Sequence, residues 1–363
     1  GAAGLPVHQL SPLDTFAVSG PLDAETSIEV FDVPEGAGDA TELVVHIDAT
    51  LSSFLADGLI SNVRSMELAL PDTTGAWVDE LLPAVSIYGA LQATGRESAV
   101  TERAAPVILD ALERIYARQN DDGGWGRALA FGPVESDLTL TADVAYALLR
   151  VREAGLPVRE GILEAALAWV ADSLDEVVAA GARQVPQALA VRVLSEARVP
   201  WPQGVGATLY ADRGDLGLAG RAHLAIAFGL VDPSDTRVVT LLDELRAAAL
   251  TDAAGTTVHW EEMTRASPGI GTPWSSAPRV THVQVTALAL DVFSTLSEEG
   301  GEIPGAVAWL MGTRRGAGWR TSYETAWALT ALADTLALSD AGSEPANLGV
   351  GTPSGTANLG VGT

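Results

Sequence analysis

Apolar residues recur at helical spacing over most of this sequence, from about residue 51 to about residue 337. Residues 108–116 show the pattern clearly, because their apolar members fall on one helix face: Ile108, Leu109, Leu112, Ile115 and Tyr116. Short breaks rich in Gly, Pro or Asp separate the Ala- and Leu-rich segments, as in 155–157 and 232–233. The pattern predicts a series of helical hairpins.

Two kinds of helix can be distinguished by their polarity. Residues 138–151 are apolar nearly all round, which indicates a helix buried on every side. Residues 242–250 carry Asp243, Glu244 and Arg246, as expected for a helix with a solvated face. An inner ring of helices inside an outer ring accommodates both kinds. The chain has 363 residues, of which 47% are hydrophobic, and this suffices for a large core.

A loose internal repeat supports an array of similar hairpins. A Gly-rich turn ending in Trp125 precedes a helix with Thr141-Ala142, and a second such turn ending in Trp319 precedes a helix with Thr325-Ala326. Residues 286–290 repeat the helical half. We interpret each Trp as a structural plug, placed where a Gly-rich turn lets two backbones approach closely.

The two ends of the chain differ from the helical part. Residues 1–50 alternate apolar and polar side chains between turn residues, which predicts β-strands. In the tail, residues 341–363, the run 346–352 recurs unchanged as 357–363. Such a Gly-rich duplicate suggests either a linker or an extended strand that awaits a partner.

Charge and composition exclude several function classes. The net charge is -26 and all 21 basic residues are Arg, so the surface repels nucleic acid and anionic membranes. The absence of Cys excludes disulfides, thiolate catalysis and Cys-ligated metals. The five His residues never recur at metal-ligand spacing, and no window is apolar enough for a membrane span. We therefore predict no metal site, no cofactor and no membrane insertion.

Several motifs occur in the order known from one family. Residues 119–126 and 137–142 resemble the helical-turn signature of complement-like thioester domains. Upstream, residues 33–36 and 81–84 resemble the run that leads into this domain in bacterial alpha-2-macroglobulins, and residues 318–329 are similar to its closing helix. The resemblance covers residues 27 to about 337.

The resemblance implies a fold and a setting. Residues 51–340 would be a mainly α domain, an α/α toroid of helical hairpins, and residues 1–50 would be a small β-portion of a CUB-like sandwich to which the tail returns. The parent protein would be a bacterial protease inhibitor, periplasmic or at the cell surface and thus extracellular. Its partners would be proteases or partner proteins, together with other domains of the same parent.

The thioester itself cannot form in this chain. By its distance from Pro83, the family's Cys-x-Glu-Gln motif falls on Thr73, Gly75 and Ala76, followed by Trp77. Ala76 offers no carbonyl to a nucleophile, and no Gln occurs between residues 9 and 92. We therefore predict a non-enzymatic domain that binds or sterically traps its partners, with Trp77 packing near the lost bond.

Two alternatives stay open. An α/α-toroid enzyme, resembling terpenoid cyclases and prenyltransferases or acting on carbohydrate, would need convergent carboxylates in a deep central pocket. Asp121 and Asp122 are the nearest acidic pair, but their Gly-rich turn favours a role in stabilising the turn. A self-assembling module would use the repeated tail as an added strand. Trp274, in a long loop, would either anchor a partner or pack on the toroid rim.

Overall fold

A computed structural model describes most of the helical part of the chain. It covers residues 51–68, 72–94, 99–126, 135–179, 185–262, 280–296, 301–315 and 318–339, with the backbone of 347–351 and 358–362. The strands predicted within residues 1–50, and Trp274, lie outside the described residues.

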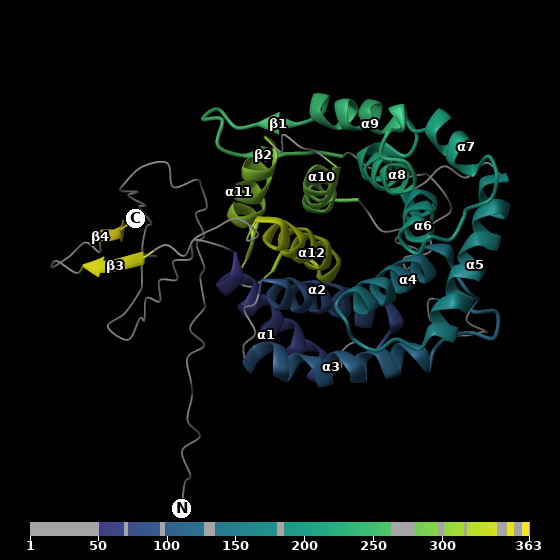
Figure 1. Ribbon diagram of the computed structural model, residues 1–363, viewed down its shortest axis with the longest axis horizontal. Helices are drawn as coiled ribbons and strands as arrows, with labels where there is room; N and C mark the ends of the chain where they lie inside the picture. The colour runs from purple at the N-terminus through teal and green to yellow at the C-terminus, as the bar shows by residue number, and fades with distance from the viewer. Residues whose placement is uncertain are drawn as a thin grey trace, which may run out of the picture.

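The even-numbered helices form a closed ring in which each packs on the next and the last returns to the first (Figure 1). They are α2 (Thr74–Ala93), α4 (Leu138–Glu153), α6 (Val185–Glu196), α8 (Gly217–Val231), α10 (His282–Leu296) and α12 (Ser322–Ser339). The odd-numbered helices surround this ring: α1 (Ser52–Leu68), α3 (Ala99–Tyr116), α5 (Glu160–Ala179), α7 (Val205–Ala211), α9 (Thr236–Ala247) and α11 (Ile303–Thr313). The predicted α/α toroid is confirmed.

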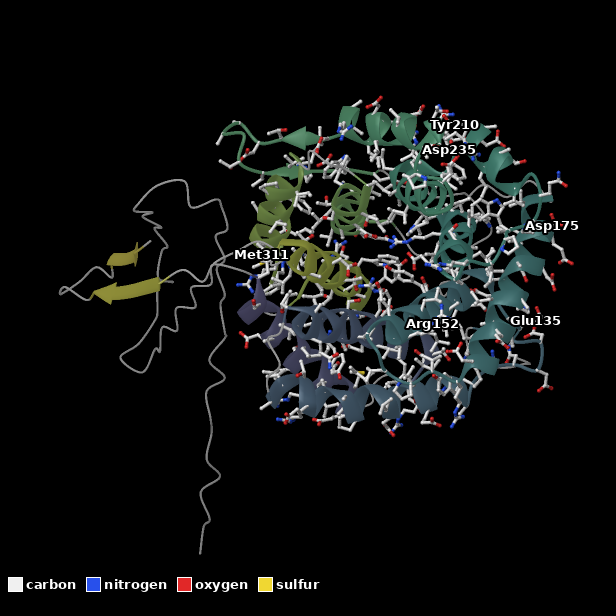
Figure 2. All side chains as sticks on the ribbon, viewed as in Figure 1. Glu135, Arg152, Asp175, Tyr210, Asp235 and Met311 are labelled. Atoms are coloured by element: carbon white, nitrogen blue, oxygen red, sulfur yellow. The ribbon has the colours of Figure 1, made fainter. Side chains whose placement is uncertain are left out.

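Sequence polarity explains which helices are inner and which are outer. Helix α8 buries an unbroken run, residues 222–229, because it is apolar on every side. Helix α9 buries only Val238, Leu241, Leu242 and Leu245, which share one face. Acidic side chains at the edge of the molecule point to solvent, as do Asp175 of outer helix α5 and Glu135, just before α4, in Figure 2.

A tryptophan–threonine contact recurs at three of the inner helices, and we call it the Trp–Thr clamp. In each clamp the backbone N–H of a Trp donates to the hydroxyl of a Thr in the first turns of the following inner helix. The N···O distances are 2.9 Å for Trp125–Thr141, 3.1 Å for Trp260–Thr286 and 2.9 Å for Trp319–Thr325. The clamps thus fix the entry of the chain into α4, α10 and α12.

The indole N–H groups of the three tryptophans are satisfied as well. They donate to Ile115 O at 2.9 Å, to Leu245 O at 2.7 Å and to Thr313 Oγ1 at 3.3 Å, respectively. Each tryptophan therefore joins the end of one outer helix to the start of the next inner helix. The plugging role of Trp125 and Trp319 stays a prediction, and the equivalent position of Trp260 was not predicted.

The turn before the first clamp requires glycine at Gly123. Its φ is +93°, and a Cβ atom would lie 2.7 Å from the carbonyl oxygen of Ala165 in α5. Both the backbone conformation and the close approach therefore exclude a side chain.

Two short antiparallel strand pairs complete the described structure. Strand β1 (Leu250–Thr251) pairs with β2 (Val258–His259). Strands β3 (Asn347–Gly351) and β4 (Asn358–Gly362) lie in the two copies of the tail repeat, and these copies pair with each other, Asn347 opposite Gly362. Among the described helices, none is both long and apolar enough to cross a membrane.

Candidate functional site

The positions predicted for a lost thioester lie at the start of inner helix α2. Thr73 is the N-cap, with extended backbone angles, and its Oγ1 accepts a hydrogen bond from Ala76 N at 3.2 Å. Such a cap satisfies one of the free N–H groups in the first turn of a helix. Gly75 and Ala76 contribute no functional side chain. The Thr73 hydroxyl oxygen therefore serves the helix as a cap.

Trp77 is held in place by charged neighbours on both sides. It is only 3% exposed, and its indole N–H donates to Asp72 Oδ1 at 2.8 Å. The guanidinium of Arg114, on α3, lies over the ring with its Cζ 4.9 Å from the ring centre. Arg118 donates to the same oxygen of Asp72 at 2.5 Å. The hydrogen bond from Trp77, assisted by the positive charge of Arg118, lowers the pKa of Asp72.

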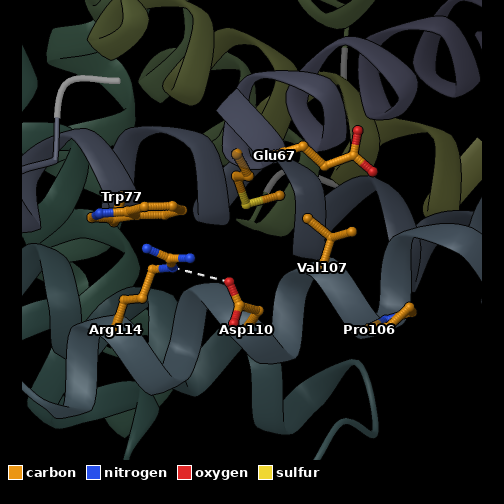
Figure 3. Close-up of a pocket in the computed structure, with 7 residues that line it drawn as sticks. Glu67, Trp77, Pro106, Val107, Asp110 and Arg114 are labelled. Atoms are coloured by element: carbon orange, nitrogen blue, oxygen red, sulfur yellow. Dashed lines mark hydrogen bonds and ion pairs between the residues drawn. The ribbon is translucent and has the colours of Figure 1, made fainter. Parts of the chain in front are cut away.

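A pocket of about 270 Å³ opens beside Trp77, between helices α1, α2 and α3. It is lined by Met66 and Glu67 of α1, Trp77 of α2, and Pro106, Val107, Asp110 and Arg114 of α3. Figure 3 shows the Arg114 guanidinium beneath the Trp77 ring, with Arg114 Nε bonded to Asp110 Oδ2 at 2.9 Å. Met66 is 4% exposed, so the pocket has an apolar floor and a charged rim.

Only one member of this pocket was predicted from the sequence. Trp77 follows the thioester-equivalent positions, and that spacing singled it out. The other lining residues come from two outer helices, α1 and α3, and their side of the pocket exists only once these helices pack together. No local pattern in the sequence marks such a contact.

Asp121 and Asp122, the acidic pair of the first Gly-rich turn, have different surroundings. Asp122 accepts hydrogen bonds from Gly124 N at 2.9 Å, Ser136 Oγ at 2.8 Å and Trp169 Nε1 at 3.2 Å. Partial desolvation opposes the charged form, but these donors together lower the pKa of Asp122. Asp121 is exposed at the same turn. Asp122 thus fixes the turn and braces it against α5.

Aromatic side chains meet across the centre of the toroid. Tyr146 of α4 stacks on Trp327 of α12, with ring centres 5.6 Å apart, and His223 of α8 meets the same Trp327 edge-on at 5.5 Å. All three side chains are buried. Three inner helices that are separated along the chain therefore contact one another through one aromatic cluster.

Buried ion pairs surround this cluster. Arg192 of α6 binds Asp291 of α10 at 2.6 Å, Glu196 at 2.7 Å and the Tyr146 hydroxyl at 3.0 Å. Arg150 of α4 pairs with Asp334 of α12. The Arg192–Asp291 and Arg150–Asp334 pairs join helices that are not neighbours in the ring.

The central burial changes the protonation of several groups. Burial raises the pKa of Asp334 to about 6, although the positive charge of Arg150 opposes the rise. Burial also raises the pKa of Glu196. Burial, and then the charge of Arg192, hold the pKa of His223 well below its usual value.

The imidazole of His223 has no polar partner within the described part of the chain, although it is fully buried. Over the same residues, no group of three or more His, Asp or Glu side chains is arranged to hold a metal ion. The central groups are thus paired with one another or packed among rings.

Comparison with known proteins finds one matching family model and several solved structures of similar fold. Residues 218–334 match the family model described as the A-macroglobulin TED domain. No curated protein matches the sequence. Among solved structures, Salmonella alpha-2-macroglobulin reacted with methylamine has a TM-score of 0.58 at 18% identity, covering 84% of this chain and 19% of that one.

Two structures from Escherichia coli are similar to the same extent. Native alpha-2-macroglobulin from domain MG7 to the C-terminus has a TM-score of 0.56 at 17% identity, covering 84% of this chain and 45% of that one. The native conformation of Escherichia coli alpha-2-macroglobulin has a TM-score of 0.58 at 17% identity, covering 84% of this chain and 18% of that one. The chain therefore spans about a fifth of the longer relatives. The predicted resemblance to the thioester domain of bacterial alpha-2-macroglobulins is confirmed; the CUB-like portion stays a prediction.

Proposed function

We propose that this chain is a thioester-free, non-catalytic domain of an alpha-2-macroglobulin-like protein, which holds proteases or partner proteins by noncovalent contact. In this proposal residues 51–340 form the thioester-like domain, residues 1–50 belong to a CUB-like sandwich, and residues 341–363 return to it. The parent protein would act in the periplasm or at the cell surface.

The start of α2 carries this proposal. A thioester needs a thiol and a carboxamide, and the chain has no Cys, while Ala76 ends in a methyl group. The side-chain oxygen at the position equivalent to the family's Cys, Thr73 Oγ1, already accepts the capping hydrogen bond from Ala76 N at 3.2 Å. The surrounding toroid, with its Trp–Thr clamps, supports a role in binding that needs the scaffold and no covalent bond.

The relatives suggest the class of partner. Escherichia coli alpha-2-macroglobulin is described as activated by porcine elastase, and also by trypsin, with TM-scores of 0.54 and 0.52. Proteases are therefore the partners that we propose for the parent of this chain.

The packing at the centre of the toroid favours a binding module over a toroid enzyme. The rings of Tyr146 and His223 both contact the ring of Trp327, and the carboxylate of Asp291 is paired with Arg192. A substrate would have to displace these contacts.

Methylamine tests the absence of a thioester directly. The Salmonella relative is described as reacted with methylamine and serves as the positive control. We expect the intact mass of this chain to stay unchanged after incubation with methylamine under the same conditions. A covalent gain in mass would overturn the proposal.

Noncovalent holding needs a second measurement. The chain is mixed with active-site-blocked trypsin or elastase, and the complex is sought by size-exclusion chromatography with light scattering. We expect a complex that dissociates in denaturant. Failure to bind either protease, with the mass result unchanged, would remove proteases from the proposal and leave the thioester-free assignment in place.

A further inference from the structure

The pocket beside Trp77 has the size of one side chain. Ligand pockets for drug-sized molecules span roughly 300–1,000 Å³, and this pocket has a volume of about 270 Å³. Helix α2 belongs to the inner ring, and α1 and α3 pack against it, so the walls of the pocket are fixed by the fold. A single protruding side chain of another protein fits it better than a free small molecule.

The lining of the pocket selects a long side chain with an apolar stem. Met66 and Trp77 are 4% and 3% exposed and form the floor, and Val107 and Pro106 continue the apolar surface along α3. A flexible methionine adapts to stems of different shape.

Carboxylates stand on two walls of the pocket, Glu67 on α1 and Asp110 on α3. The contact of Glu67 with Arg103 is long, 3.9 Å, and Arg103 is 72% exposed, so this contact is easily exchanged. Asp110 uses Oδ2 for Arg114, which lies flat on the Trp77 ring. Both carboxylates therefore keep acceptor capacity beside the pocket.

The charge of the whole chain points to the same occupant. A net charge of -26 attracts cationic partners and repels anionic ones. We propose that this pocket takes the side chain of a Lys or Arg on a partner protein, with its stem on Met66 and Val107 and its cationic head between Glu67 and Asp110. The inference rests on the proposed function, because it names the chemistry of the noncovalent partner.

Methionine methyl NMR on the full chain tests this proposal at one atom. The chain has only three Met residues, Met66, Met263 and Met311, and Met66→Leu identifies the Met66 signal. The probe is N-acetyl-arginine amide, and N-acetyl-citrulline amide is the uncharged control of nearly the same shape. We expect the arginine probe to shift the Met66 signal saturably, and the citrulline probe to shift it far less.

Charge variants locate the cationic head. We expect Glu67→Gln and Asp110→Asn each to weaken the binding of the arginine probe about threefold, as for exposed ion pairs. Higher salt should weaken its binding further. Asp172→Asn, at an exposed position of outer helix α5, is the matched control and should leave the affinity unchanged. Circular dichroism checks that each variant is folded.

Three outcomes would overturn the proposal: an unmoved Met66 signal, an equal response to both probes, or equal affinity in Glu67→Gln and the native chain. An equal response would instead define an apolar pocket. These results are independent of methylamine, because covalent incorporation would refute the proposed function without changing what Met66 reports.

Discussion

Removing the Thr hydroxyl should destabilise the protein more at the two buried Trp–Thr clamps than at the partly buried one. The variants are Thr141→Val, Thr286→Val and Thr325→Val, which keep the shape of the side chain and delete its oxygen. In each, the backbone N–H of the partner tryptophan loses its acceptor.

The cost depends on whether water can replace the hydroxyl. The N–H groups of Trp125 and Trp260 lie in buried hydrogen bonds of 2.9 and 3.1 Å, so each would be left unsatisfied. A buried unsatisfied donor costs about 1–3 kcal/mol, and we expect about 2 kcal/mol at both sites. The bond to Trp319 is only partly buried. Water can reach that N–H, and we expect a loss below about 1 kcal/mol for Thr325→Val.

Urea unfolding followed by circular dichroism measures these differences, with thermal unfolding as a second probe. For a large domain about 2 °C is lost per kcal/mol, so Thr141→Val and Thr286→Val should lower Tm by about 4 °C. Thr240→Val is the control, because its hydroxyl only makes a 3.3 Å bond to Thr236 O on the exposed side of α9. We expect a change within about 0.5 kcal/mol there.

Two results would refute this reasoning. One is a Thr325→Val variant at least as destabilised as the two buried ones. The other is a change at Thr141 and Thr286 no larger than that at the Thr240 control. Either result would mean that the clamps are by-products of packing and contribute little to stability.

Further variants test the turn at Gly123, the pH dependence of stability that Asp334 causes, and the buried pair of Arg192 with Asp291. Gly123→Ala should lower the free energy of unfolding in urea by about 3 kcal/mol, because it combines backbone strain with steric overlap. Gly155 has φ +76° and nothing within 4 Å of a Cβ, so Gly155→Ala should lower it by only about 1 kcal/mol. Equal losses would contradict the close approach at Gly123. The pKa of Asp334 is raised to about 6 in the folded chain, so its stabilising contribution is present below about pH 4 and lost as pH rises through 6. Asp334→Asn should therefore flatten Tm against pH between 4 and 6, and an unchanged slope would contradict the raised pKa. Asp291→Asn should lower the free energy of unfolding by about 3 kcal/mol, because it leaves Arg192 buried without one of its partners; a loss below about 1 kcal/mol would argue against this pairing.

Local patterns predicted the parts of the fold that depend on local chemistry. The apolar run in α8 and the one-sided pattern of α9 distinguish inner from outer helices without any tertiary information. Trp125 and Trp319 were identified because each belongs to a Gly-rich turn just before its helix. The Trp260 clamp was missed because its Thr286 partner lies 26 residues further along the chain.

Long-range contacts could not be predicted in this way. Arg150 and Asp334 are 184 residues apart, and nothing beside either residue identifies the other. His223 is likewise in the core, and its ring nitrogens have no partner within the described residues, which no pattern in the sequence indicates. For the candidate site, the sequence supplied Trp77, while the pocket required the packing of α1 against α3.

The closure of the inner ring has a consequence for how the chain is made. Helix α2, which begins at Thr74, packs on one side against α12, the last inner helix, and the Arg150–Asp334 pair joins α12 to α4, the inner helix that follows α2. During synthesis the side of α2 that packs against α12 stays uncovered until residues 322–339 have emerged. Contacts between such distant segments form slowly, and exposed apolar surface favours aggregation in the meantime. A nascent chain that stalls before α12 would therefore present the helix bearing the candidate site to chaperones and proteases as an open apolar face.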